Sequence, residues 1–403
     1  MRLPTAPPSL VASRLPAAHL GPELVEARRR LWFDDAGGRP LDVPGGLLTE
    51  YYADRRGSPL RRIVETANRW AVDLETVVLL AGGASADVAR GIFEAAAHPY
   101  YNSLSHGARG GRPRLAILQP VDDDDLLQGV LDLVRRTGES IERHDRWAVW
   151  IEGADDSAEG AALAATAAPL LSALAETAKS SDDARSRTIV TTSTGEPCRG
   201  FPADIPATFA RRLDFPTLWN GAGFAAAALS GADVVGLAKG MTWFAEDLKR
   251  RAPNECPVAR LVTWIAQGPV ELRTGHHAFD GLANWFARRI NASETGGSPG
   301  GPARMTVVPA WQSAERRRSD GDANGDRHKA GGARPLDLVC ETPRRDRLHA
   351  ASATAAADAP AAGVDEPSTD ERAEIRITRL NEVAIGELCA WLSAAKLLFD
   401  ATR

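Results

Sequence analysis

The chain of 403 residues has little cysteine, no excess of basic charge and no long uninterrupted apolar run. Its four cysteines lie far apart and form no Cys-x-x-Cys pair, so the sequence argues against a zinc site and predicts reduced, buried thiols. The net charge of −5, without a basic stripe interleaved with aromatic residues, argues against nucleic acid as a partner. No stretch resembles a signal peptide or approaches a membrane span, so we expect a cytoplasmic protein without membrane contact.

The composition is that of a folded protein with more than one domain. Apolar residues make up 44% and charged residues 25% of the chain, and its length suits two α/β domains. We predict an N-terminal arm over residues 1–40, a first domain over 41–213 and a second over 214–403. Three segments rich in Gly, Asp, Arg, Ala, Pro or Ser are predicted as mobile loops of the second domain, at 296–301, 319–332 and 350–370.

The most informative segment runs from residue 77 to residue 134 and alternates strand and helix. The apolar run 77–81 predicts a buried strand, and Gly82 and Gly83 permit a tight turn after it. Ser85 is predicted as the N-cap of the next helix, whose free N–H groups could bind an anion. Residues 114–118 predict the return strand and 126–134 the following helix. The segment therefore predicts a βαβ unit with a phosphate site at Gly83 and Ser85.

The same alternation continues along the chain. Residues 147–151 and 188–192 predict further strands, separated by a helix over 158–178, and later strands are predicted at 270–273 and 335–340. Such alternation predicts an α/β fold in which a doubly wound parallel sheet is covered by helices on both faces. Ligands of such sheets bind at the carboxyl ends of the strands.

The polar clusters do not predict a metal centre, and we expect no cofactor. The acidic run 122–125 opens a predicted helix, where acidic residues complement the helix dipole. His276 and His277 are adjacent, so they point to different sides of a regular element, and no third ligand is near them in sequence. Both histidines are predicted as surface residues.

Several motifs together resemble the glucose-6-phosphate isomerase family, which is built from two sugar-isomerase (SIS) domains. The turn Ala-Gly-Gly-Ala-Ser at 81–85 matches the family's Gly-Ile-Gly-Gly-Ser turn. The further matching segments are HPYYNSL at 98–104, RGGRPR at 109–114, GADVVGLAKG at 231–240, WFARRINASETGG at 285–297 and LNEVAIGEL at 380–388. The resemblance spans about residues 45–400 and implies two doubly wound SIS-like domains in three αβα layers. It also implies homodimers with shared sites.

The resemblance extends poorly to the residues that carry the family's chemistry. Its hydroxyl-rich phosphate loop corresponds to residues 152–160, where Glu152, Asp155 and Asp156 are three carboxylates that the family's loop lacks, and only Ser157 keeps a hydroxyl. Ala292 stands where the catalytic glutamate is expected, and Glu294 lies two residues further on. The family's catalytic arginine corresponds to residues 213–217, which contain no arginine, and its histidine to residues 310–318, which contain no histidine. The family's catalytic lysine has no match in this sequence.

Two functions remain open from the sequence. The preferred hypothesis is a catalytically inactive relative that binds a sugar phosphate or small anion, or acts as an oligomeric scaffold, as a homodimer or together with an intact isomerase. The alternative is an active aldose-ketose isomerase that interconverts glucose 6-phosphate and fructose 6-phosphate. In that case Glu294 is the base, while Ser85 and Ser157 hold the phosphate.

Overall fold

The computed structural model divides the chain into two compact units. The continuous unit comprises residues 47–235, and the discontinuous unit comprises residues 1–46 and 236–403. The sequence analysis placed the boundary at 213/214 and the N-terminal arm outside both domains. The structure describes residues 11–15, 21–33, 43–54, 57–120, 124–138, 146–152, 158–191, 207–209, 221–294, 305–309, 333–342 and 373–402. The predicted loops at 296–301, 319–332 and 350–370 lie outside these residues.

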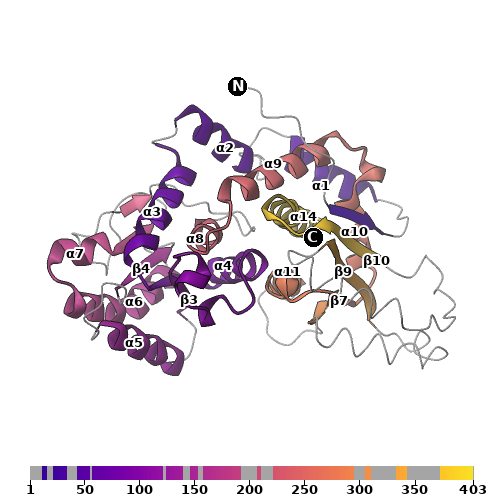
Figure 1. Ribbon diagram of the computed structural model, residues 1–403. Helices are drawn as coiled ribbons and strands as arrows, with labels where there is room; N and C mark the ends of the chain where they lie inside the picture. Colours follow the sequence, from indigo (N-terminus) through magenta and orange to yellow (C-terminus); the bar gives the residue numbers. More distant parts are fainter. Residues whose placement is uncertain are drawn as a thin grey trace, which may run out of the picture. The chain divides into compact units, whose positions relative to one another are not determined.

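The continuous unit is built on a parallel sheet of strand order β3-β2-β4-β5-β6 (Figure 1). Its strands are β2 (Thr76–Ala81), β3 (Arg114–Leu118), β4 (Trp147–Glu152), β5 (Thr188–Thr191) and β6 (Ala207–Phe209). Its helices are α3 (Pro59–Asp73), α4 (Gly83–Ala96), α5 (Asp124–Gly138), α6 (Ala158–Thr177), α7 (Ser181–Ser186) and α8 (Gly221–Leu229), with short 3₁₀ turns η2 (Tyr101–Ser103) and η3 (Gly107–Arg109). Helix α2 (Val43–Ala53) crosses the boundary between the units in sequence.

Helices cover both faces of this sheet because its central strands are apolar on both sides. Every residue of β2 and β4 is buried. Val78 and Leu80 join a core cluster with residues of α5 and α6, whereas Trp150 on the opposite face packs edge to face against Trp70 of α3, with ring centroids 5.9 Å apart. This doubly wound arrangement confirms the predicted fold class for the first half of the chain.

Helix α6 is long and apolar enough, by length and composition, to cross a membrane. Leu163, Leu170 and Leu174 of this helix belong to the core cluster against β2 and β4. These leucines cover the sheet, and 33% of the apolar window is buried. The sequence alone predicted no stretch of this length.

Asp183 fixes the amino ends of β4 and β5. Its carboxylate pairs with Arg187 at 2.8 Å and also with Arg146, and it accepts a hydrogen bond from the Lys179 amide at 3.0 Å. Burial alone would raise the pKa of Asp183, but the amide hydrogen bond and the two guanidinium groups outweigh it and hold the pKa below its usual value.

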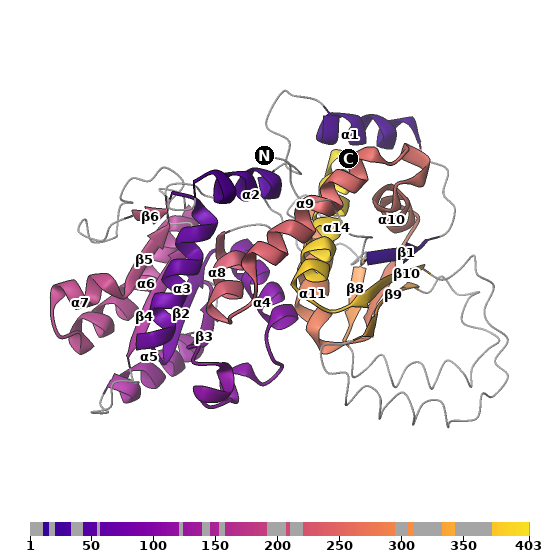
Figure 2. The same ribbon diagram turned by 45° about the horizontal axis from the view of Figure 1, so that its top comes forward.

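The discontinuous unit has a second sheet of strand order β1-β10-β9-β7-β8 (Figure 2). Its strands are β1 (Val11–Arg14), β7 (Val270–Thr274), β8 (Met305–Val308), β9 (Arg334–Thr342) and β10 (Ala373–Arg379). Its helices are α1 (Pro22–Phe33), α9 (Val234–Arg250), which begins just before the boundary, α10 (Pro257–Ala266), α11 (Asp280–Glu294) and α14 (Glu382–Ala401), with 3₁₀ turns η4 (Pro253–Glu255) and η5 (His277–Phe279). All strand pairs are parallel except β1 with β10.

The N-terminal residues belong to the second sheet and its helices, which differs from the predicted arm. Val11 of β1 pairs with Ile377 of β10. In α1, the buried Arg28 donates to the carbonyl oxygens of Leu248 at 3.1 Å and Arg251 at 2.5 Å, and its guanidinium lies over the Trp32 ring. A cation at these carbonyls, at the end of α9, complements the helix dipole, so α1 has a specific docking site.

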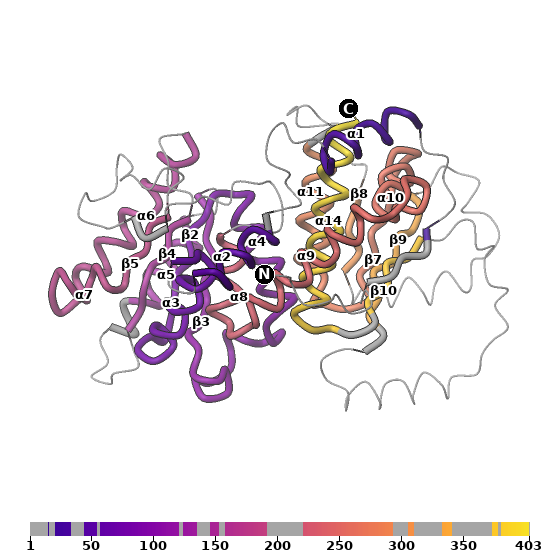
Figure 3. Tube along the Cα trace, turned by 90° about the horizontal axis from the view of Figure 1, so that it is seen from above, coloured from indigo at the N-terminus to yellow at the C-terminus, as the bar shows by residue number. Residues whose placement is uncertain are grey.

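Helices α9 and α14 cross at two glycines (Figure 3). A Cβ atom built on Gly240 would lie 2.0 Å from the carbonyl oxygen of Val383, and one on Gly386 would lie 2.1 Å from that of Leu237. Both distances are impossible for real atoms, so this close backbone approach requires glycine at both positions.

The cysteine prediction is confirmed for the described part of the chain. Cys256, Cys340 and Cys389 are free thiols and are buried. Burial raises the pKa of the Cys389 and Cys256 thiols, which keeps both protonated and unreactive. Cys198 lies outside the described residues.

Candidate functional site

The candidate site lies at the carboxyl ends of the strands in the continuous unit. Helices α4 and α6 begin after β2 and β4, and α8 also begins at this edge, against the last residue of β4. In a parallel sheet covered on both faces, this edge gathers helix N-termini and polar loop residues, and it is where ligands bind.

The turn between β2 and α4 is occupied by a carboxylate of the chain itself. Gly82 is the N-cap of α4, and the backbone N–H of Gly83 donates to Glu159 Oε1 at 3.0 Å. A Cβ atom on Gly82 would lie 2.2 Å from the same oxygen, so Gly82 lets the Glu159 side chain approach. Glu159 comes from the first turn of α6 and is exposed.

Ser85 does not cap the helix, so that prediction was wrong. Helix α4 begins at Gly83, which places half-buried Ser85 inside the first turn. The extended backbone of Gly82 starts the helix earlier, and the Glu159 carboxylate rather than a hydroxyl accepts from the first helical N–H. Gly83 and Ser85 remain together at the predicted turn.

A second carboxylate lies at the end of β4. Glu152 is 6% exposed, and its Oε2 accepts hydrogen bonds from Thr191 Oγ1 at 2.6 Å and Trp150 Nε1 at 3.4 Å. A Cβ atom on Gly221 would lie 2.2 Å from Glu152 Oε1, so this carboxylate is packed against the first residue of α8. The edge thus has a carboxylate at the start of α4 and another at the start of α8.

These two carboxylates determine what the edge can bind. The N-terminus of a helix carries about half a positive charge and attracts anions, and here side chains of the chain satisfy that attraction. A phosphate at the start of α4 would have to displace Glu159 and would face the negative charge of Glu152. The geometry therefore disfavours a phosphate at the position where the sequence predicted one.

The remaining predicted site residues are not brought together by the described structure. Ser157 lies outside the described residues, as do the segments that the resemblance matched to the family's arginine and histidine. Glu294 is the last residue of α11 in the discontinuous unit, and its side chain lies outside the description. Ala292, in the same helix, is exposed and has no group that could accept a proton.

A polar cluster that the sequence analysis did not anticipate lies at the carboxyl end of β7. Buried Asp280 accepts a hydrogen bond from Thr274 Oγ1, and its other oxygen lies 3.0 Å from His277 Nδ1. His277 is 61% exposed, which agrees with its prediction as a surface residue. The spacing His-x-x-Asp at the start of a helix was the available signal. Within the described ranges, no group of three or more His, Cys, Asp or Glu residues is placed to hold a metal ion.

The comparisons with known proteins identify the fold. No protein-family model and no protein of curated function matches the sequence. A hypothetical protein from Thermus thermophilus matches with a TM-score of 0.63 at 18% identity, over 94% of this chain and 89% of the other. A glucose-6-phosphate isomerase from Chlamydia trachomatis matches with a TM-score of 0.59 at 12% identity, over 94% of this chain and 78% of the other. The chain has a sugar-isomerase fold. At these identities the likeness concerns architecture, and activity depends on the site residues.

Proposed function

We propose that this chain is a sugar-isomerase-fold protein without isomerase activity, kept as a scaffold that binds a small anion or sugar phosphate and assembles into oligomers. The fold agrees with the family resemblance, whereas the residues at the positions of the family's catalytic groups differ in chemistry. The observation that carries the loss of activity is the hydrogen bond from the Gly83 amide to Glu159, because a carboxylate of the chain occupies the turn at which an isomerase would hold its substrate.

The helix that should carry the base supports the same proposal. The resemblance places the catalytic glutamate at Ala292, where a methyl group is exposed in α11. A general base contributes about 10²- to 10⁴-fold to a proton transfer, so a chain without it retains little isomerisation.

A coupled assay tests the proposal directly. Purified protein is mixed with fructose 6-phosphate, and formation of glucose 6-phosphate is followed through a dehydrogenase, with an intact isomerase as the positive control. We expect a rate equal to the blank. Turnover above the blank that is lost in Glu294→Ala would contradict the proposal.

The likeness to the Chlamydia trachomatis isomerase keeps one alternative open. In an active aldose-ketose isomerase, Glu294 would be the base, and Ser85 with Ser157 would hold the phosphate. Loss of turnover in both Glu294→Ala and Ser157→Ala would favour it, whereas a blank rate in the parent protein would exclude it.

The scaffold role has its own tests. We propose a homodimer, or an assembly with an intact isomerase, in the cytoplasm. Sedimentation of the purified protein over a range of concentrations distinguishes a monomer from a dimer. Affinity capture from the native cells should recover a second, intact isomerase chain if the mixed assembly exists, and its absence would leave the homodimer as the proposed state.

A further inference from the structure

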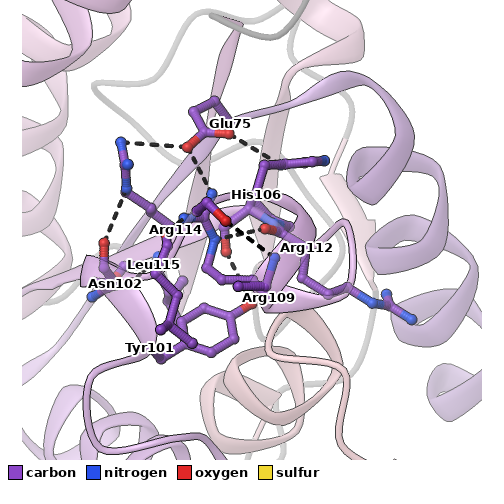
Figure 4. A network of polar contacts seen from close by, with 12 residues as sticks. Glu75, Tyr101, Asn102, His106, Arg109, Arg112, Arg114 and Leu115 are labelled. Atoms are coloured by element: carbon purple, nitrogen blue, oxygen red, sulfur yellow. Dashed lines mark hydrogen bonds and ion pairs between the residues drawn. The ribbon is translucent and has the colours of Figure 1, made fainter.

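A network of charged side chains lies at the opposite edge of the same sheet, at the amino ends of β2 and β3 (Figure 4). Glu75, which precedes β2, accepts a hydrogen bond from Arg109 Nη2 at 2.6 Å and forms an ion pair with Arg114 Nη1 at 3.3 Å. His106 Nδ1 lies 3.0 Å from its other oxygen. The side chain of Arg109 is fully buried. Glu75 therefore pairs with both arginines that point toward it, although its single negative charge offsets only one of their two positive charges.

Backbone contacts hold the rest of the loop between α4 and β3 in place. Asn102 exchanges two hydrogen bonds of 2.9 Å with the backbone of Leu115, and the Tyr101 hydroxyl donates to the carbonyl oxygen of Pro113 at 3.1 Å. Arg109 Nε donates to the carbonyl oxygen of Arg112 at 2.9 Å. This hydrogen bond holds the backbone of Arg112 in place and does not involve its side chain.

The guanidinium of Arg112 differs from those of its neighbours. No dashed line reaches it in Figure 4, and its side chain runs away from Glu75. Arg112 Nη1 is buried and has no hydrogen-bond partner among the described residues. Arg112 as a whole residue is partly exposed.

Gly231 makes room for this side chain. Its φ of +87° suits glycine, and a Cβ atom there would lie 3.3 Å from Arg112 Nε and 3.5 Å from Arg112 Cγ. The stem of Arg112 therefore lies against the turn that follows α8, where a glycine leaves room for it.

The local charge balance is positive although the chain as a whole is negative. Arg109 and Arg114 share the single carboxylate of Glu75, and Arg112 adds a third positive charge that no described carboxylate pairs with. Burial raises the pKa of Tyr101 to about 12, with the positive charges of Arg109 and Arg112 opposing the rise, so this phenol stays neutral and supplies no counter-charge. A buried charged donor without an acceptor is costly, and a bound anion would remove that cost.

We propose that Arg112 is the centre of a binding site for a phosphate group, either free phosphate or the phosphate of a monoester. A planar guanidinium presents paired N–H donors that match phosphate oxygens, and the excess positive charge of the neighbouring arginines favours an anion. The site lies on the edge of the sheet opposite the candidate site, so it is independent of the isomerase question.

Calorimetric titration of the full chain tests the proposal. The titrants are inorganic phosphate and, separately, fructose 6-phosphate, each against sodium chloride of equal ionic strength to remove screening effects. We expect saturable binding to the parent protein. Arg112→Gln should weaken it about tenfold or more, and Arg112→Lys should weaken it less, because a lysine keeps the charge but not the paired donors.

Arg185→Gln is the matched control. Arg185 is an exposed arginine of the same unit, paired with Asp182 at 3.8 Å, so its replacement removes the same charge elsewhere. Its affinity for phosphate should stay within about twofold of the parent value. Binding of phosphate alone identifies a free-ion site, and Arg112-dependent binding of fructose 6-phosphate alone identifies a monoester site.

Two results would overturn the proposal: equal affinity in the parent protein and Arg112→Gln, or no saturable binding of either titrant by the parent protein. Since the Arg112 side chain makes no hydrogen bond with the described residues, Arg112→Gln should fold. In phosphate-free buffer its melting temperature should equal or exceed that of the parent, and a lower one would contradict the unpartnered state. The isomerase assay is unaffected by either outcome, so failure here and failure of the proposed function are distinguishable.

Discussion

Glu159→Gln removes the negative charge at the start of α4 while keeping the size of the side chain. In the parent protein, Glu159 Oε1 accepts from the Gly83 amide at 3.0 Å and lies against Gly82. The glutamine can still accept from that amide through its carbonyl oxygen. The substitution therefore isolates the charge and leaves the hydrogen bond in place.

This change should have two effects: a lower free energy of unfolding and a higher affinity for phosphate. A carboxylate beside a helix N-terminus contributes about 0.3–1 kcal/mol to stability, so the free energy of unfolding should fall by that amount. Two unit charges 4 Å apart repel each other by about 1 kcal/mol in water and by more where the surroundings are less polar. Because Glu159 is exposed, the lower value applies. The affinity of the turn should rise roughly 5-fold for a phosphate monoanion and roughly 30-fold for a dianion, whose repulsion is twice as large.

The assay is a phosphate titration in an Arg112→Gln background, which silences the proposed site at the other edge of the sheet. Glu176→Gln is the matched control, since Glu176 is an exposed carboxylate of the last turn of the same helix. We expect a gain for Glu159→Gln alone. An equal gain in both variants would mean a general charge effect, and no gain in Glu159→Gln would refute the idea that this carboxylate keeps phosphate out.

Three further outcomes test the packing and the buried charges. Gly240→Ala should lower the free energy of unfolding by about 1–3 kcal/mol in a denaturant titration. Gly129→Ala, at an exposed position of helix α5 with open space for a Cβ atom, should raise it by about 0.5–1 kcal/mol, and equal effects would contradict the close helix crossing. Glu75→Gln should cost about 3–5 kcal/mol because Arg109 is then buried without its counter-charge, and a loss below 1 kcal/mol would contradict that pairing. Asp183→Asn should be less stable than the parent at neutral pH. The pKa of Asp183 in the folded protein lies below its usual 3.8, so the stability that its carboxylate contributes is present above pH 3.8 and is lost as the pH falls through the folded pKa. Thermal melts should therefore show the parent and Asp183→Asn converging in stability at low pH, and a stability difference that persisted there would refute this reasoning.

Much of the fold could be predicted from the sequence because its strongest elements are simple in pattern. Strands β2 and β4 are uninterrupted apolar runs, and the Gly-Gly turn after β2 marks the start of a helix. The elements that were missed lack such signals. Strand β10 alternates apolar residues with Glu and Arg, and β1 and β8 have only four residues each. Helix α8 is rich in alanine and glycine and is buried all round, so it shows no amphipathic period.

The candidate site was predictable in composition and unpredictable in detail. The acidic character of the segment after β4 was visible, and so was the Gly-Gly turn. The contact between Gly83 and Glu159 joins residues 76 positions apart, and no local pattern indicates which carboxylate reaches the helix start. Arg112 Nη1 has no partner because the nearby carboxylate, Glu75, pairs with Arg109 and Arg114 instead. The sequence does not indicate which of the three arginines pair with Glu75.

The pairing of β1 with β10 has a consequence for biosynthesis. Val11 pairs with Ile377, so β1 cannot pair with β10 until residue 377 has been synthesised. Residues 47–235 form a unit that is continuous in sequence and can acquire its core long before that moment. The chain connectivity thus allows the continuous unit to fold before β1 pairs with β10.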